Sequence, residues 1–269
     1  MSMFCYQCQE ALKNVGCTAA GVCGKKKDTA NLQDLLVYNL RGIAALEERA
    51  MAKRPLNMET GLFLVQSLFI TITNGNFDNV RITDQITESL MLKKGLLAEV
   101  GDDGTLPEEA KWFGTEADYE AQAAVVGVLK EPNEDIRSLK ELIVYGVKGL
   151  AAYAEHAAML DREDEKIYAF VVKALAAVTK NLGTDELVAL TLQTGACAVD
   201  TMALLDQAHT DTYGKPEMTQ VSIGVRTNPG ILVSGHDLRD LEDLLVQTEG
   251  TGVDVYTHSE MLAAHAYPA

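Results

Sequence analysis

The sequence is short of positive charge. Its 269 residues include 23 lysine and arginine residues against 39 aspartate and glutamate residues, for a formal net charge of -16 and a pI near 4.7. This balance argues against a nucleic-acid partner, because binding phosphates requires a concentrated basic surface. The one basic cluster, Lys25 to Lys27, is short. It is typical of a solvated loop, and the alternative is a docking site for an acidic electron donor.

A long apolar run is also missing. No stretch approaches the roughly 20 apolar residues that span a bilayer, and the N-terminus lacks the charged, apolar and cleavage segments of a secretory leader. We therefore expect a soluble, cytoplasmic protein with no membrane partner. With 47% hydrophobic residues, the chain can bury a core sufficient for one large domain or two ordinary ones.

Cysteine is scarce and unevenly placed. Four of the five cysteines fall within the first 23 residues. In a cytoplasmic protein such crowding favours metal or redox chemistry over structural disulfides. The fifth, Cys197, lies in a helical run of small residues, and we interpret it as a buried, inert thiol.

Apolar residues recur at helical spacing through most of the chain. In the first predicted helix they include Leu32, Leu36, Leu40 and Ile43, and Asp28 or Thr29 is the expected N-cap. The second helix is expected to end at a turn over residues 73–76. The first three predicted helices span about 32–50, 58–72 and 80–97.

The pattern of the first helix then returns. Residues 32–51 read LQDLLVYNLRGIAALEERAM and residues 139–158 read LKELIVYGVKGLAAYAEHAA, with Val-Tyr, Gly and Ala-Ala in register. Internal duplication is the favoured explanation, and convergence of two alanine-rich helices is the alternative. Two more helices are predicted at about 163–181 and 185–208.

These helices predict a helical domain made of two three-helix bundles. The segment 101–131 is expected to link the bundles through a short helix. The predicted domain covers residues 31–215, with the bundles at about 31–100 and 132–210.

Beyond Pro216 the sequence changes to short apolar runs separated by turns. A helix between apolar runs predicts a parallel, Rossmann-like sheet. Residues 216–269 are too few to cover such a sheet on both faces, so we expect them to be the start of an α/β domain. The predicted strands are 221–225, 231–234 and 253–257, and the predicted helix is 238–247.

The N-terminal cysteines, in a loop predicted over residues 1–30, form the motif Cys5-x2-Cys8-x8-Cys17-x5-Cys23. Four thiolates from one small, glycine-bearing loop are the number that closes an iron–sulfur cluster. Zinc is the alternative, because four cysteines also suit a tetrahedral zinc site. Zinc sites more often use two short knuckles, whereas the second pair here is spaced by five residues, so iron and sulfur are favoured.

Two further candidate ligands follow predicted strands. His236 comes after the strand 231–234, and Glu260 comes after the strand 253–257. Open α/β sheets place their ligands at the carboxyl ends of strands, so an imidazole and a carboxylate could meet there as metal ligands. Taken alone, each is more often a helix cap or a satisfied polar residue.

Several segments of this sequence resemble the hybrid cluster protein, or prismane, family. The resemblance covers nearly the whole chain as the N-terminal half of the family's sequence. It implies a [4Fe-4S] cluster on the four N-terminal cysteines. It rests on MFCYQCQEALKNVGCTAAGVCGK, TANLQDLL, NPGILVSGHDLRDLEDLL and GTGVDVYTHSEM.

The same resemblance implies a second, hybrid [4Fe-2O-2S] cluster in the complete protein. His236 and Glu260 match the first histidine and first glutamate that bind it in the family, and Thr73 and Asn74 match a turn between the two clusters. The family also supplies several cysteines to this cluster. The sequence departs from that pattern, since no cysteine follows Cys197.

The function that the resemblance implies is a cytoplasmic redox enzyme of anaerobic or nitrosative metabolism. It would reduce hydroxylamine to ammonia or nitric oxide to nitrous oxide, with electrons from a small redox donor protein and with a missing C-terminal half as partner. Two alternatives stay open: a stand-alone, single-cluster electron-transfer protein, and a zinc-stabilised helical binding module.

Overall fold

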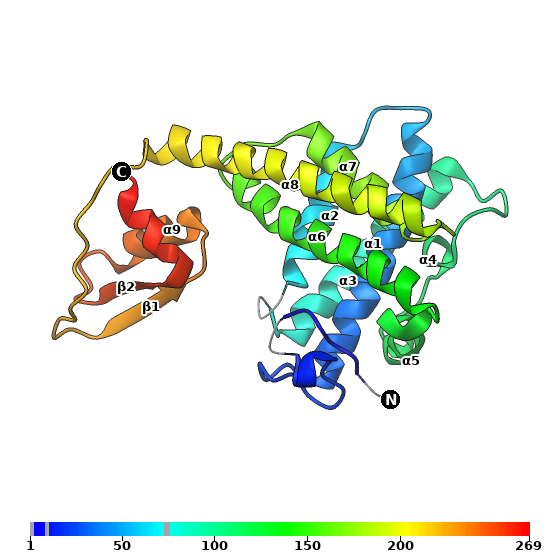
Figure 1. Cartoon of the computed structure of the whole chain (residues 1–269), viewed down its shortest axis with the longest axis horizontal. Helices are drawn as coiled ribbons and strands as arrows, with labels where there is room; N and C mark the ends of the chain where they lie inside the picture. Colours follow the sequence, from blue (N-terminus) through cyan, green and yellow to red (C-terminus); the bar gives the residue numbers. More distant parts are fainter. Residues whose placement is uncertain (1–2, 9–10, 73–75) are drawn as a thin grey trace. The chain divides into compact units, whose positions relative to one another are not determined.

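The structure, a computed structural model, describes residues 3–8, 11–72 and 76–269. It is mostly helical and contains a small two-stranded parallel sheet (Figure 1). The chain divides into two compact units: unit 1 is Met1–Glu155 with Asp164–Thr201, and unit 2 is His156–Glu163 with Met202–Ala269. The predicted turn with Thr73 and Asn74 lies outside the described residues. The domain boundaries predicted near residues 30 and 215 stay predictions.

The first three predicted helices are present as α1 (Lys27–Met51), α2 (Met58–Ile70) and α3 (Asn79–Val100). The predicted N-cap of α1 is wrong: Lys26 occupies that position, without a capping side chain. Asp28 lies in the first turn instead, where a carboxylate is favoured by the positive end of the helix dipole.

The second set of three helices is α6 (Glu134–Ala158), α7 (Glu165–Ala177) and α8 (Thr184–Tyr213). Helices α1 and α6 both have 25 residues, and α2 and α7 both have 13. Their first residues differ by the same offset of 107 positions, from 27 to 134 and from 58 to 165. This shared offset is the pattern that internal duplication predicts.

The segment between the two sets is more ordered than the single short helix predicted. It contains α4 (Glu108–Lys111), α5 (Glu116–Val126) and the 3-10 turn η2 (Val128–Lys130). Helix α5 starts with a capping box of Thr115 and Asp118. This capping satisfies backbone N–H groups at the start of the helix and stabilises it within an otherwise polar linking segment. Both α4 and α5 pack against α1.

The core of unit 1 is built around α1, which packs most extensively against α3 and also contacts α7. Helix α2 contacts α7 as well, so helices of both sets share this core. Burying each large apolar side chain contributes about 1.5–3 kcal/mol relative to exposure. The α1 side chains with no exposed surface include Leu35, Leu36, Leu40, Ile43 and Leu46.

The core also holds one buried cation on α3. Lys93 has no exposed surface, and its ammonium donates to Oδ1 of Asn39 at 2.6 Å and to the backbone oxygen of Glu109 at 3.0 Å. The aromatic rings of Trp112 and Phe113 lie 5.6 Å and 5.1 Å from it. Burial lowers the pKa of Lys93 to about 7, against the opposing charge of the Glu109 carboxylate.

This lowered pKa predicts a pH-dependent stability. Between about pH 7 and the ordinary lysine value of 10.5, the unfolded chain binds a proton that folded Lys93 does not. The free energy of unfolding should therefore rise with pH in this range, by up to about 1.4 kcal/mol per pH unit. Lys93→Met should remove that slope in urea unfolding at several pH values. Equal slopes in both proteins would contradict the assignment.

Unit 2 contains β1 (Gly230–Ser234), α9 (Leu238–Thr248), β2 (Asp254–His258) and the 3-10 helix η3 (Ser259–Ala266). The strands are parallel, with Gly230 opposite Asp254 and Ser234 opposite His258. This confirms two predicted strands and the helix between them. Leu232 of β1 is 67% exposed, so within the described residues the sheet lacks the double cover typical of parallel strands.

The predicted strand at residues 221–225 is wrong. Those residues form no helix or strand, and the side chain of Ile223 is fully exposed. An apolar run becomes a strand only when a neighbouring strand supplies hydrogen-bond partners for its backbone, and the only strands that pair within the described residues are β1 and β2.

The expectation that no stretch approaches the length and apolarity of a membrane span needs correction. Helix α8 is long and apolar enough, by length and composition alone, to cross a membrane. It carries the carboxylates of Asp200, Asp206 and Asp211 along its second half. Length and composition do not separate a span from a helix of a folded domain, so this helix by itself assigns no membrane.

Candidate functional site

The cysteine loop is closed by pairing between its first and third cysteines. The backbone N–H of Cys5 donates to the oxygen of Cys17 at 3.0 Å, and the N–H of Cys17 donates to the oxygen of Cys5 at 2.7 Å. Cys17 is buried beside Met3 and Ala30. The fourth cysteine of the motif, Cys23, is exposed. The loop thus runs from a buried thiol to one at the surface.

Glycines allow the turn around the fourth cysteine. A Cβ atom at Gly21 would lie 3.0 Å from the sulfur of Cys23 and 3.2 Å from the backbone nitrogen of Lys25. Gly24 has a φ of +89°, in the left-handed region that favours glycine. All four motif cysteines are free thiols. Four thiols on one tightly turned loop fit an iron–sulfur cluster, and metal analysis separates that group from zinc.

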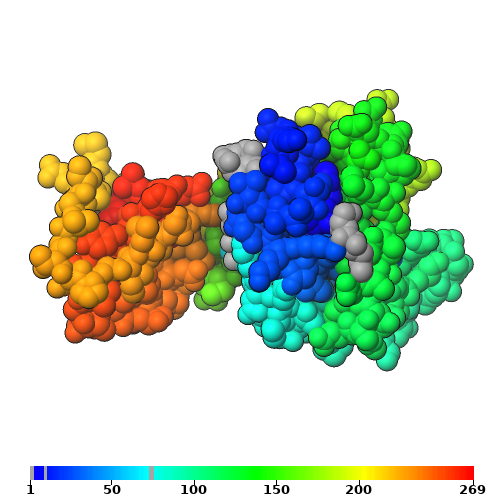
Figure 2. Space-filling model, turned by 90° about the horizontal axis from the view of Figure 1, so that it is seen from below, coloured from blue at the N-terminus to red at the C-terminus, as the bar shows by residue number. Residues whose placement is uncertain are grey.

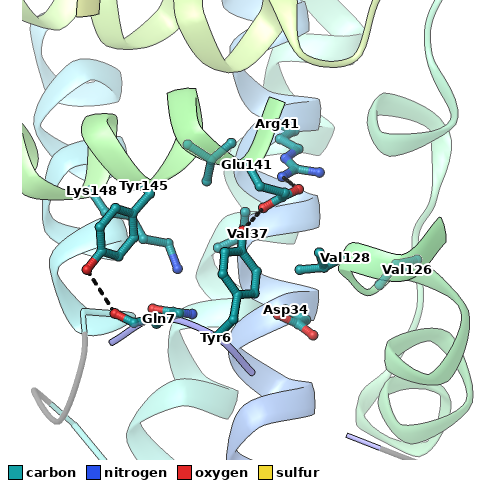
Figure 3. A pocket seen from close by; sticks show the side chains of 11 residues that line it. Tyr6, Gln7, Asp34, Val37, Arg41, Val126, Val128, Glu141, Tyr145 and Lys148 are labelled. Atoms are coloured by element: carbon teal, nitrogen blue, oxygen red, sulfur yellow. Dashed lines mark hydrogen bonds and ion pairs between the residues drawn. The ribbon is translucent and has the colours of Figure 1, made fainter. Parts of the chain in front are cut away.

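Helix α6 holds the segment between Cys5 and Cys8 (Figure 3). The hydroxyl of Tyr6 donates to Oε2 of Glu141 at 3.2 Å. The hydroxyl of Tyr145 donates to the backbone oxygen of Gln7 at 3.0 Å. Two hydrogen bonds from the second set of helices therefore fix the residues between the first two cysteines.

These contacts belong to a buried charge cluster between α1 and α6. Arg41 pairs with Glu141 at 2.8 Å, and Asp34 and Lys148 line the same small cavity of about 30 Å³, room for a single water molecule. The offset of 107 residues relates Asp34 to Glu141 and Arg41 to Lys148. Each set therefore contributes one acid and one base.

Burial dominates the ionisation of this cluster. It raises the pKa of the Asp34 carboxyl, against the lowering effect of Lys148, and it lowers the pKa of Lys148. Burial and the Glu141 charge raise the pKa of Tyr6, so its hydroxyl keeps its proton and stays a donor.

Removing the Tyr6 hydroxyl should loosen the loop. Tyr6→Phe deletes one hydrogen bond to a charged group, worth about 1.5–3 kcal/mol. We expect the backbone amides of residues 3–8 to exchange hydrogen at least about tenfold faster, measured by mass spectrometry of the metal-loaded chain. The control, Tyr256→Phe in unit 2, should leave those amides unchanged; equal rates in all three proteins would show that the contact does not hold the loop.

The lysine cluster is not uniformly solvated, so that interpretation is wrong for Lys25. Its side chain is buried, donates to Oε1 of Gln33 at 2.7 Å and lies 5.7 Å from the ring of Phe77. Lys26 is exposed and Lys27 is partly exposed. Lys25 therefore holds the loop on α1, and only its neighbours face solvent.

Cys197 is buried on α8, as predicted. Burial raises the pKa of its thiol, against a hydrogen bond with Thr201 that lowers it. A neutral, buried thiol is a poor nucleophile and a poor metal ligand.

Unit 2 brings the two strand-end candidates together. His236 follows β1, Glu260 lies in η3 after β2, and Nδ1 of His236 is 3.4 Å from Oε2 of Glu260. Burial and His156 lower the pKa of His236, while Glu260 raises it. The predicted meeting of the two side chains is confirmed, and their role as metal ligands stays a prediction.

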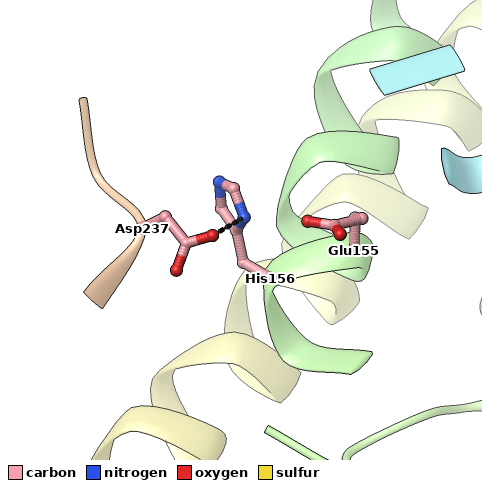
Figure 4. Close-up of side chains that lie close together, drawn as sticks. All are labelled: Glu155, His156 and Asp237. Carbon is pink, nitrogen blue, oxygen red and sulfur yellow. Dashed lines mark ion pairs between the residues drawn. The ribbon is translucent and has the colours of Figure 1, made fainter. Parts of the chain in front are cut away.

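Sequence reasoning missed His156, which stands beside this pair. Nδ1 of His156, at the end of α6, lies 3.0 Å from Oδ2 of Asp237 (Figure 4), and its ring centre lies 4.8 Å from that of His236. Burial raises the pKa of Asp237, but its hydrogen bonds with His156 and with backbone N–H groups lower it overall. His156 occupies the position that Arg49 holds in the first set, 107 residues earlier. This histidine, at the position where the first set has an arginine, was the sequence signal that could have indicated His156.

Comparisons with known proteins agree over the full chain. Residues 3–269 match the family model described as Prismane/CO dehydrogenase family. A protein named hydroxylamine reductase from Desulfitobacterium hafniense (strain DSM 10664 / DCB-2) is 56% identical over 276 residues, covering 100% of this chain and 50% of that protein. A hydroxylamine reductase from Bacteroides thetaiotaomicron is 54% identical, covering 100% of this chain and 49% of that protein. One from Nitratidesulfovibrio vulgaris is 53% identical, covering 99% of this chain and 50% of that protein. The chain spans about half the length of these curated relatives.

Proposed function

Because the chain belongs to the Prismane/CO dehydrogenase family, we propose that it is half of an iron–sulfur hydroxylamine reductase and carries the cluster through which electrons enter. The observation that carries this proposal is the loop of four free cysteines, with Cys5 and Cys17 paired through their backbones. A [4Fe-4S] cluster bound there would supply one-electron transfer. The four thiolates of the motif would hold it.

Different residues of this chain would have different roles around that cluster. Tyr6, through Glu141, and Tyr145, through the backbone of Gln7, fix the segment between the first two thiolates. Buried Cys17 keeps water from one side of the loop, and exposed Cys23 leaves another side open. An electron could therefore reach the loop from solvent without passing through the helical core.

The second centre, a hybrid [4Fe-2O-2S] cluster, is proposed at the ends of β1 and β2. His236 and Glu260 would supply a nitrogen and an oxygen ligand, a set of mixed softness suited to iron. His156, held by Asp237, packs its ring against His236 and would orient that imidazole. The family's cysteine ligands for this centre have no counterpart after Cys197 and would come from the other half of the protein.

The reaction proposed for the whole protein is reduction of hydroxylamine. It takes up two electrons and two protons and gives ammonia and water. Reduction of nitric oxide to nitrous oxide is the second proposed reaction. A cytoplasmic location and a small redox protein as donor complete the proposal.

A second candidate function is stand-alone electron transfer by the single N-terminal cluster. The motif of four cysteines, which needs no ligand from outside this chain, favours it. Under this proposal the chain would be reduced by a donor and oxidised by an acceptor, without turning over hydroxylamine.

Metal analysis separates these functions. The chain should be purified without oxygen and assayed for iron, zinc, acid-labile sulfide, EPR of the reduced state and hydroxylamine turnover. About four irons with one reduced-cubane signal would support the N-terminal cluster, and about eight with further high-spin signals would support both centres. Zinc without iron or sulfide would refute the redox function. One cluster without turnover, also after adding the other half of a relative, would favour electron transfer alone.

A further inference from the structure

We propose that the exposed side of the cysteine loop is a docking surface for a small acidic electron-transfer protein. Leu12, Val15 and Val22 form its apolar part, and Lys13 and Lys26 form its basic part. The inference rests on the proposed function and identifies where the donor binds and what its surface must carry. We call these five residues the docking surface.

Exposure is the first observation behind this surface. Leu12 is 50% exposed, Val15 69% and Val22 58%. Leu12 and Val15 lie between Cys8 and Cys17, and Val22 directly precedes exposed Cys23. These three branched apolar side chains are exposed within a few residues, in sequence, of the motif cysteines, and a patch of exposed apolar side chains marks a contact surface. In Figure 2 the N-terminal residues, in dark blue, gather on one face of unit 1.

Charge is the second observation. Residues 1–30 contain four lysines against Glu10 and Asp28, a net charge of +2, whereas the whole chain carries -16. The other 239 residues therefore carry -18. Lys13 and Lys26 are exposed. A bound [4Fe-4S] cluster with its four thiolates would add about -2 and bring these residues close to zero charge. An acidic partner would therefore be repelled by the rest of the chain and least opposed at the loop, where the exposed lysines steer its approach.

The two observations specify the partner. Exposed lysines on the same loop as a small apolar contact suit brief, salt-sensitive encounters between redox proteins rather than a permanent complex. A docked donor would lie against the exposed thiol side of the loop. It would pass one electron to the cluster there, so that the donor is oxidised by one electron and the cluster is reduced by one. No proton or group is transferred in this step.

The test is the rate of electron transfer from a dithionite-reduced, small acidic [2Fe-2S] ferredoxin, followed anaerobically by stopped flow. Reversing both exposed lysines, Lys13→Glu with Lys26→Glu, should lower the second-order rate constant at low salt at least about tenfold. In the variant the rate constant should no longer fall as salt is added, because salt now screens a repulsion instead of an attraction. Weaker binding of the oxidised ferredoxin, measured by calorimetry, gives a readout independent of turnover.

A matched control separates local docking from net charge. Lys53→Glu with Lys94→Glu makes the same charge change at exposed positions. Lys53 follows the C-terminal end of α1, whereas Lys26 precedes its N-terminal end, and a helix of 25 residues is about 37 Å long. The control should keep the rate constant within about twofold. Equal losses in the two variants, or no loss in either, would overturn the proposal.

Two further measurements complete the design. Val22→Ser should slow transfer severalfold at high salt as well as low salt, since it removes apolar contact rather than charge; an unchanged rate would overturn the apolar part. EPR after dithionite alone reports whether the chain binds a reducible cluster, so failure of the proposed function is seen separately. If Lys13→Glu with Lys26→Glu instead dissociates a homodimer in sedimentation, the surface binds a second copy and the proposal is wrong.

Discussion

Replacing Cys17 with alanine is expected to abolish the reduced-cubane EPR signal and to lower iron from about four atoms to below about one per chain. Cys17 is proposed to supply one of four thiolates, and it is the buried one, paired with Cys5 through two backbone hydrogen bonds. Its sulfur is proposed to bind the cluster from the buried side of the loop, where solvent has little access. Iron, sulfide and EPR measurements on anaerobically purified protein test this expectation.

The chain contains its own control for that substitution. Cys197→Ala removes a buried thiol on α8, outside the motif, and should leave iron, sulfide and the EPR signal unchanged. If Cys17→Ala kept full iron content, or if Cys197→Ala lost it, the assignment of the N-terminal motif would be refuted. Equal far-ultraviolet circular dichroism of the two variants would show that both remain folded.

Gly42→Ala is expected to cost about 3 kcal/mol of stability or more. A Cβ atom at Gly42 would lie 2.1 Å from the backbone oxygen of Glu109 and 2.9 Å from the backbone nitrogen of Ala110. These are backbone atoms of α4, so the whole helix would have to shift. That shift would also move the Glu109 oxygen away from the ammonium of Lys93.

Gly149→Ala is the matched control. Gly149 is the equivalent of Gly42 in the second set, 107 residues later, and a Cβ atom there would meet nothing within 4 Å. Replacing an exposed helical glycine should be neutral or stabilise by up to about 1 kcal/mol. Urea unfolding of the two variants measures both changes. Equal effects would show that the contact between α1 and α4 does not restrict Gly42.

The sequence predicts where the helices of unit 1 lie better than it predicts which elements pack against them. The apolar spacing around Leu36 and Leu40 reports which face of α1 is buried, because helical geometry places those residues together. It does not report that α4 covers Gly42, since a glycine carries no information about the surface opposite it. The wrong strand at residues 221–225 has a similar cause: strand formation depends on a partner that the run itself does not encode.

At the candidate sites, too, the sequence indicates the ligand residues but not the residues that support them. Cysteine spacing and strand ends indicate Cys5, Cys17, His236 and Glu260, because the chemistry of a ligand is a property of one residue. The support around them is not local. Tyr6 and Glu141 are 135 positions apart, and no sequence window includes both.

The contact between α1 and α7 has a consequence for synthesis of the chain. Helix α1 ends at residue 51 and α7 at residue 177, so 126 residues are added before α7 is complete. At about 5–20 residues per second, the nascent α1 waits roughly 6–25 s for this partner. The apolar surface that α7 later covers is therefore open on the ribosome, and a holding chaperone would have time to bind it.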